Sequence, residues 1–519
     1  MILSLSLFFF IKGVGTERFT VYYKEGYKEE AKIALSYLEK YYSHCDSITG
    51  NSVEHLVVVI EDIGTLSNGF ADPIAPTIHL FTNVPYPDFH FGTMRSWWRT
   101  VCLHEYTHIS HMTNVGCIPY FLRYVFGKIF LPNVLNPLYI VEGVTVFTES
   151  SIVPYEGRLN EGYYDAYKNL LATRKRLPSL PYLKHLPIDY PGYSLGYLIG
   201  GEFTEFLSGD STLARSAFYK DKKGKKRFKL DKYYTAFGKS LINGLIMDFA
   251  APVVFGKSRD RMYKEWIMEE QKKATYKMVK GKELVKGYRV GLTEKDNKGI
   301  YVYRYNVRAL SFDYVENYGE VVFINLRTGR KKTIIKGNIV LPMKKDRNSL
   351  YAALLDLKKG GKNYSYSGFR VVSSIFKITG DKKEKILTDE IKAFTVKDGI
   401  LYYVKKKGVG SVIYRNGEIF YSFDSLLVQD MEIDKLNNIY FIGYKEGDGN
   451  NLYLLAKRKE LKQITDEDFS FSGIFLDGGN IYFSANYKGR WQVYRYDISE
   501  DNFYIINSDE LAGYPVKKE

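Results

Sequence analysis

The sequence is poor in the two residue types that most often bind metals. It contains only three cysteines, Cys45, Cys102 and Cys117, in 519 residues. Three cysteines cannot form a disulfide framework or a cysteine-based structural zinc site. Histidine is also scarce, because all eight histidines lie before residue 186 and three of them fall within eight positions. That short histidine cluster is therefore the first candidate for chemistry.

A long hydrophobic run is also missing. Ile2–Ile11 is apolar but far shorter than the roughly 20 residues needed to span a bilayer. Its length fits the hydrophobic region of a secretory signal, and the small residues at 13–15 suit cleavage, although no basic residue precedes Lys12. We therefore predict a signal peptide or N-terminal anchor over residues 1–15 and an extracytoplasmic location (periplasmic, secreted or envelope-associated). A buried strand and a start further upstream remain the alternatives.

The overall composition is that of a globular protein with a basic excess. Hydrophobic residues make up 45% of the chain and charged residues 26%, which excludes a largely disordered protein. The net charge of +15 admits nucleic acid or an anionic membrane surface as a partner, and about thirteen of these charges follow residue 270. The densest cluster, 220–227, is typical of a solvated loop, and no nucleic-acid-binding motif accompanies it. We expect no nucleic acid, and a membrane surface stays open as a partner.

Strand-like and helix-like segments alternate in the first half of the chain. The hydrophobic patterns predict strands at 19–23, 56–60 and 78–81 and helices at 28–42 and 96–112. The segment 118–137 is apolar and aromatic but is interrupted by prolines, Arg123 and Lys128. This order predicts an α+β domain over residues 16–275.

The second half shows a repeat of short aromatic strands between glycine, asparagine and aspartate turns. Five similar segments contain Tyr301, Tyr351, Tyr402, Tyr440 and Tyr482, which are 50, 51, 38 and 42 residues apart. A four-stranded propeller blade has about 40–50 residues. The last unit, 481–497, resembles a blade of the TolB-like propellers. We predict an all-β propeller of five or six blades over residues 280–519, with an irregular β-sandwich as the alternative.

The histidine cluster contains an HExxH motif, formed by His104, Glu105 and His108. On a helix, positions i and i+4 lie on one face, so both imidazoles can bind one metal ion. Glu105 lies about 100° around the helix, beside a metal-bound water. Two solvated histidines are the alternative, but the apolar neighbours of the motif indicate a buried helix, and buried imidazoles need partners.

The third ligand is not given by the HExxH motif itself. A metzincin would place histidine where this chain has Asn114, so that class is excluded. His111 lies near the same face, but one straight helix cannot direct three ligands at a tetrahedral ion, so we interpret it as a supporting or structural residue. The segment 141–149, with Glu142 and Glu149, resembles the second zinc-binding helix of the gluzincins, the superfamily of thermolysin-like and aminopeptidase-N-like peptidases. The resemblance implies that Glu142 is the third ligand and that Glu149 hydrogen-bonds a liganding histidine.

The chain departs from the gluzincin pattern in its spacing. Family members place the third ligand closer to the second histidine, whereas 33 residues separate His108 from Glu142 here. The additional residues lie in 118–137, and an insertion between two helices need not change which faces of the helices pack together. It does leave Glu149 and Glu156 as rivals of Glu142.

A third segment, which begins at Tyr193, resembles the Tyr-x-x-Gly segment of aminopeptidase-like gluzincins. The resemblance implies that the Tyr193 hydroxyl stabilises the oxyanion. The aminopeptidase signature Gly-Ala-Met-Glu-Asn is absent, and 69–72 does not replace it, so specificity for a free N-terminus is not supported. We expect an edge strand at 78–81 to pair with an extended peptide.

These observations predict a zinc metallopeptidase, most simply an endopeptidase, that binds one Zn²⁺ through His104, His108 and Glu142. Glu105 would act as general base toward a zinc-bound water. The expected substrate is a peptide or protein, and the propeller would bind or gate it or contact a protein partner. The alternative is a catalytically inactive peptidase-like protein that serves as a propeller-based interaction module at the cell envelope.

Overall fold

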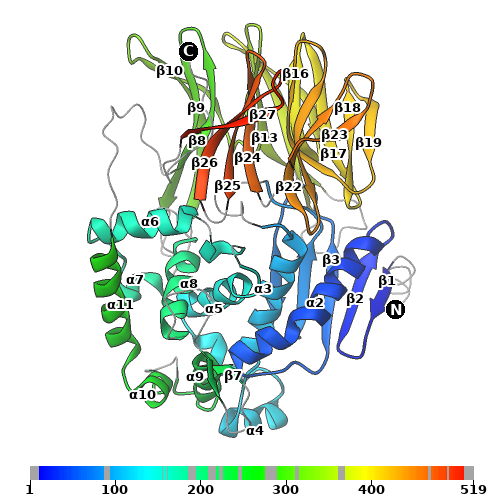
Figure 1. The fold of residues 1–519 in the computed structure, drawn as a ribbon. Helices are drawn as coiled ribbons and strands as arrows, with labels where there is room; N and C mark the ends of the chain where they lie inside the picture. Colours follow the sequence, from blue (N-terminus) through cyan, green and yellow to red (C-terminus); the bar gives the residue numbers. More distant parts are fainter. Residues whose placement is uncertain are drawn as a thin grey trace.

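The computed structural model shows a helical α/β region below a β-propeller (Figure 1). It describes residues 11–86, 94–154, 156–160, 162–184, 194–208, 218–220, 226–243, 248–274, 289–309, 315–359, 369–465, 469–487 and 490–507. Most of the predicted 1–15 segment lies outside these residues, and residues 11–15 form the first strand. No helix in the described parts of the chain combines the length and the apolar character needed to cross a membrane.

A five-stranded sheet forms one side of the α/β region. Its strands are β1 (Ile11–Gly15), β2 (Phe19–Lys24), β3 (Leu56–Glu61), β4 (Gly69–Asp72) and β5 (Thr77–Phe81), in the order β1-β2-β3-β5-β4. The strands β2, β3 and β5 are parallel, and β1 and β4 are antiparallel additions at the two edges.

The predicted edge strand at 78–81 is therefore wrong, because β5 pairs with β3 on one side and with β4 on the other. The physical reason is a tight turn. The Asp72 carboxylate accepts the backbone N–H groups of Ile74 and Ala75 (2.8 and 3.2 Å) and folds 69–72 back onto β5. The edge of the sheet is thus β4.

Helices pack against this sheet and against one another around two hydrophobic cores. The predicted helix at 28–42 runs on to residue 49, and the predicted helix at 96–112 is confirmed, with the Ser96 hydroxyl capping its first turn through Arg99 N–H (2.9 Å). The helices are α2 (Lys28–Thr49), α3 (Trp97–Met112), α4 (Cys117–Phe126), α5 (Leu138–Ser150), α6 (Gly162–Thr173), α7 (Leu180–Leu183), α8 (Ser194–Ser208), α9 (Lys229–Phe237), α10 (Ala250–Phe255) and α11 (Arg259–Lys273), with short 3₁₀ turns η1 (Pro132–Leu135) and η2 (Arg158–Asn160) and a hairpin of β6 (Phe218–Lys220) and β7 (Lys226–Phe228).

The second half folds into a five-bladed β-propeller, and each blade is a four-stranded antiparallel sheet. The blades are β8–β11 (Arg289–Asp296, Gly299–Ala309, Val315–Asn325, Lys331–Lys336), β12–β15 (Lys344–Asp346, Ser349–Lys359, Phe369–Thr379, Lys382–Asp389), β16–β19 (Ile391–Lys397, Ile400–Lys407, Gly410–Arg415, Glu418–Phe423), β20–β23 (Leu427–Ile433, Ile439–Lys445, Gly449–Leu455, Leu461–Gln463) and β24–β27 (Phe469–Asp477, Asn480–Tyr487, Arg490–Asp497, Asn502–Asn507).

The tyrosine repeat in the sequence marks the second strand of every blade, because β9, β13, β17, β21 and β25 each carry one repeat tyrosine. The turns before three of these strands use left-handed residues, Arg347, Asp398 and Asn437, with φ of 52°, 52° and 68°. Five blades are present in the described residues. A sixth is not, since 289–292 belongs to β8 and 275–288 lies outside the described chain.

The propeller holds the segment that leads from the sheet into α3. The Lys392 ammonium donates to the Val84 carbonyl (2.6 Å), and the Tyr86 hydroxyl donates to the Asp430 carboxylate (3.3 Å). At the start of α3, the backbone N–H of Trp97 donates to the Tyr444 hydroxyl (2.8 Å). The propeller thus fixes both ends of the connection between β5 and α3.

Candidate metal centre

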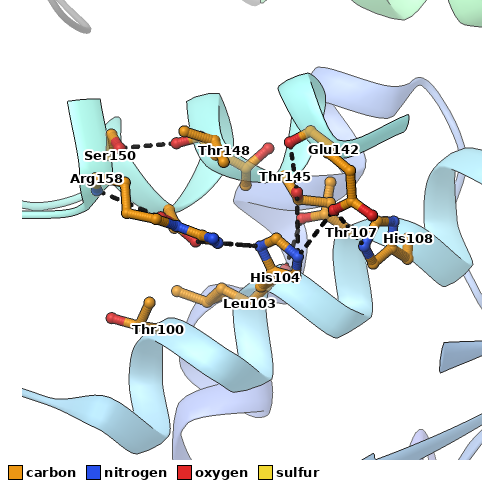
Figure 2. Close-up of polar contacts among 12 residues, drawn as sticks. Thr100, Leu103, His104, Thr107, His108, Glu142, Thr145, Thr148, Ser150 and Arg158 are labelled. Atoms are coloured by element: carbon orange, nitrogen blue, oxygen red, sulfur yellow. Dashed lines mark hydrogen bonds and ion pairs between the residues drawn. The ribbon is translucent and has the colours of Figure 1, made fainter. Parts of the chain in front are cut away.

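Two packed helices, α3 and α5, bring three potential metal ligands together (Figure 2). His104 and His108 project from one face of α3 toward Glu142 on α5. All three residues are buried, with exposed fractions of 6%, 7% and 6%. Their ligand atoms lie within 4.8 Å of one another. Glu142 is the fifth residue of α5 and not its first, because the helix begins at Leu138.

The distances in this cluster fit a tetrahedral ion. The Nε2 atoms of His104 and His108 each lie 3.4 Å from Glu142 Oε2. Zinc binds imidazole nitrogen and carboxylate oxygen at about 2.0–2.2 Å, so two ligand atoms at tetrahedral angles are about 3.4 Å apart. A direct imidazole–carboxylate hydrogen bond would be shorter, at about 2.7–2.9 Å. Two imidazoles and one carboxylate are also the donor set of a zinc site with an open fourth position.

Glu105 is buried next to the three potential ligands. The edge strand β4 passes so close that a Cβ placed on Gly69 would lie 2.9 Å from Glu105 Cγ and 3.0 Å from Glu105 Oε1. Burial raises the pKa of the Glu105 carboxyl, and the two histidines partly oppose the rise. Sequence reasoning gave Gly69 no role at the site, because nothing in the residues around it signals a contact with Glu105.

His104 is held by groups on the side opposite Glu142. Its Nδ1 lies 3.1 Å from Glu149 Oε2, and the same carboxylate accepts hydrogen bonds from the Arg158 guanidinium at 2.6 and 2.7 Å. An Arg158 nitrogen also lies 2.8 Å from His104 Nδ1 (Figure 2). An N–H group on Nδ1 that points to Glu149 would leave Nε2 as the ligand atom, which is the tautomer that a metal requires, whereas the Arg158 guanidinium can only donate and favours the opposite tautomer. Glu149 and Arg158 therefore compete for Nδ1.

Electrostatics keep the two glutamates of α5 ionised. Burial disfavours the charge on Glu142, but His108 and His104 outweigh burial and hold the pKa of this carboxyl well below its usual range. Arg158 does the same for Glu149 and lowers its pKa to about 2 against the effect of burial. Arg158 was not predicted, because the sequence does not indicate which of its many basic residues neutralises Glu149.

Thr145 and Tyr197 were also missed. The Thr145 hydroxyl donates to the Glu142 carbonyl (2.7 Å) and lies 3.3 Å from His104 Nε2. The ring of Tyr197, on α8, stacks on the His104 imidazole with 5.9 Å between centroids. Tyr193 lies outside the described residues, and α8 begins at the next position.

The remaining candidates do not join the cluster. His111 is completely buried, and its Nε2 lies 3.5 Å from Asn136 Nδ2. Burial, with a contribution from His108, lowers the pKa of His111 to about 3, so it is a neutral core residue. Glu156 is buried in an ion pair with Arg99. Within the described chain, the metal-binding group contains Glu142 and neither Glu149 nor Glu156.

The segment 118–137 leaves the pairing of α3 with α5 intact. It forms α4 and η1, and the Asn133 amide donates to the carbonyls of Asn114 and Tyr234 (2.8 and 3.2 Å). These bonds tie the end of the segment to the end of α3 and to α9. The unusual spacing between His108 and Glu142 is therefore accommodated outside the site.

Comparisons with known proteins assign no family. No protein-family model and no curated protein matches the chain. Solved structures with some similarity include dipeptidyl peptidase 4 of Porphyromonas gingivalis (10% identity, TM-score 0.26, 41% of this chain and 36% of that chain), the tricorn protease (12%, 0.29, 42% and 22%) and the β-propeller domain of the Trilobed protease from Pyrococcus furiosus (14%, 0.26, 42% and 82%). This chain spans well under two thirds of the first two. At these identities and TM-scores the similarities carry no functional assignment.

Proposed function

We propose that this protein is a zinc-dependent peptidase of the gluzincin type, with endopeptidase activity and one Zn²⁺ per chain. The observation that carries the proposal is the convergence of His104, His108 and Glu142 at distances that suit a tetrahedral ion. The sequence resemblance of the helices that contribute them supports the same class. The ligand atoms are nitrogen and oxygen, which agrees with zinc at a catalytic site.

The chain's own residues supply the rest of the proposed mechanism. Zinc, when bound, would lower the pKa of a bound water and polarise the substrate carbonyl. Glu105 accepts the proton of the attacking water and delivers it to the nitrogen of the leaving amine, so that the peptide bond breaks without a free proton entering solution. Its burial suits this role, because burial raises the pKa of the Glu105 carboxyl toward neutral pH, where a group can both accept and release a proton. Tyr193 remains our proposed oxyanion donor.

The edge strand β4 supports a peptide as substrate. Among the described residues it pairs only with β5, and we propose that an extended chain pairs with its other edge. At Gly69 the strand touches Glu105, so a peptide bound along β4 would pass the proposed general base. The propeller, which holds the start of α3 through Trp97, is suited to bind or gate substrate. We propose an extracytoplasmic location, from the N-terminal segment.

The test is metal analysis beside a proteolysis assay on wild type and Glu105→Gln. The variant should retain stoichiometric zinc and lose hydrolysis by a factor of roughly 10² or more, because the proton transfer is lost while the ligands stay. The matched control is Glu54→Gln, an exposed glutamate that should behave as wild type. Hydrolysis by Glu105→Gln at the wild-type rate would falsify the mechanism. Zinc-loaded wild type without any peptide turnover would instead favour the inactive interaction module.

A further inference from the structure

The helix α4 exposes a large apolar surface on the α/β region. Six large apolar or aromatic side chains in α4 and just after it are between 61% and 88% exposed. We call them the α4 surface: Ile118, Tyr120, Phe121, Tyr124, Phe126 and Ile129. Only Pro119 is buried among the ten helical residues. A helix that is apolar on most sides normally lies in a protein core or in lipid, and contiguous exposed apolar patches of this kind mark interaction sites.

The charged residues that flank α4 in the sequence have one sign. No aspartate or glutamate occurs between Glu105 and Glu142, and the only formally charged side chains in that interval, histidines aside, are Arg123 and Lys128. Lys128 is exposed at the end of α4. The exposed Lys239 lies at its beginning, where a Cβ on Gly116 would be 3.3 Å from Lys239 Cγ. Basic residues that flank apolar and aromatic ones complement an anionic lipid interface.

The same end of the molecule carries further exposed apolar residues. A hydrogen bond from the Gly116 N–H to the Gly238 carbonyl (3.1 Å) joins the start of α4 to the region after α9. Beyond it, Ile242, Phe249 and Val253 are 49%, 49% and 79% exposed. Figure 1 shows α4 and α10 at the end of the molecule farthest from the propeller. The apolar surface is thus broader than one helix.

We propose that the α4 surface docks the protein on an anionic phospholipid bilayer, with α4 lying in the plane of the interface. Ten helical residues are about 15 Å long, half the thickness of the hydrocarbon core, so α4 cannot cross it. A protein groove would engage one face of a helix, whereas α4 exposes apolar groups on several sides. Tyrosine and phenylalanine with nearby lysines are suited to the headgroup region. The proposal is independent of the zinc site.

Vesicle co-sedimentation of the full chain tests the proposal. Wild type should bind vesicles of phosphatidylcholine with phosphatidylglycerol more tightly than vesicles of phosphatidylcholine alone, and added salt should weaken the binding. Phe121→Ser combined with Tyr124→Ser and Phe126→Ser should lower binding at least roughly tenfold, since three apolar side chains no longer enter the interface. The matched control, Ile419→Ser with Leu436→Ser, changes two propeller residues of similar exposure (69% and 71%) and should bind as wild type.

A second variant separates charge from apolar contact. Lys128→Gln with Lys239→Gln should reduce binding to the anionic vesicles roughly tenfold and leave binding to the neutral ones unchanged. Glu105→Gln should bind vesicles as wild type does, so a failure of the peptidase proposal would not be mistaken for a failure of this one. Equal vesicle binding by wild type and the triple serine variant would overturn the proposal. So would a wild-type dimer that this variant dissociates, because the α4 surface would then face a second copy.

Discussion

The α/β region and the propeller each bury a cluster of charged groups, but they balance the charge differently. In the propeller, the Lys344 ammonium lies 3.0 Å from Asp430 and 2.8 Å from Glu432. Lys344 is on β12 and the two carboxylates are on β20, so this pair joins the first strands of two non-adjacent blades. In the α/β region, Glu142 faces two imidazoles at 3.4 Å.

The difference shows how to tell a structural cluster from a site. Lys344 offers only N–H donors, so the propeller cluster is held by hydrogen bonds between its own side chains. Neutral imidazoles present lone pairs to the same point as Glu142, and those lone pairs need a proton or a metal ion. The first arrangement joins two blades, whereas the second arrangement is a group of side chains that could hold a metal ion.

The largest effect is expected at the propeller cluster. Lys344→Met leaves the buried Asp430 and the partly buried Glu432 without their cation and should lower the free energy of unfolding by about 3–5 kcal/mol. Urea unfolding measures this change, and zinc content should be unaffected. The control is Lys345→Met, which removes a partly exposed partner of Asp296 at 3.7 Å and should cost under about 1 kcal/mol. A loss for Lys344→Met as small as that of the control would contradict the comparison.

The next effect concerns the support of His104. Glu149→Leu combined with Arg158→Met removes the buried ion pair as a whole, so no single charge is left behind. His104 Nδ1 then lacks both of the side chains that hold the ring, and zinc affinity should fall about 10–100-fold. Competition with a chromophoric chelator measures this affinity. Unchanged affinity in a folded double variant would show that Glu149 and Arg158 serve stability alone.

The smallest effect is a pH dependence. The pKa of His111 is about 3 in the folded chain and about 6.5 when unfolded, so between these values the unfolded chain binds one more proton. Stability is then lost as the pH falls from 6.5 toward 3, by about 1.4 kcal/mol per pH unit. His111→Gln should reduce the measured slope by this amount in urea titrations at pH 5 and pH 6, with His55→Gln on the exposed surface as the control. The partly buried His44, whose pKa burial lowers to about 4, keeps its own contribution in both variants. An unaltered slope in His111→Gln would mean that His111 is charged in the folded protein.

Much of this protein could be predicted from the sequence because the signals are local. The i, i+4 spacing of His104 and His108 needs only a helix, and the tyrosine repeat needs only strands of similar length. The edge strand was placed at 78–81 and not at 69–72, because the hairpin of β4 and β5 depends on one side chain, Asp72, which accepts the backbone N–H groups of the following turn. The roles of Arg158 and Gly69 were not predicted, because their contacts join segments that are distant in sequence and follow no periodic pattern.

The sequence alone determined the helix at 96–112, the repeat of strands in the second half and which residue types are chemically able to bind a metal ion. Only the tertiary structure decided which carboxylate meets the histidines, because Glu142, Glu149 and Glu156 have the same chemistry and differ in the direction in which packing turns them. It likewise decided that α4 lies on the surface, since an apolar segment carries no sign of whether other elements will cover it. The residue types and their spacing follow from the sequence, whereas which side chains meet and which stay exposed depends on how the chain packs.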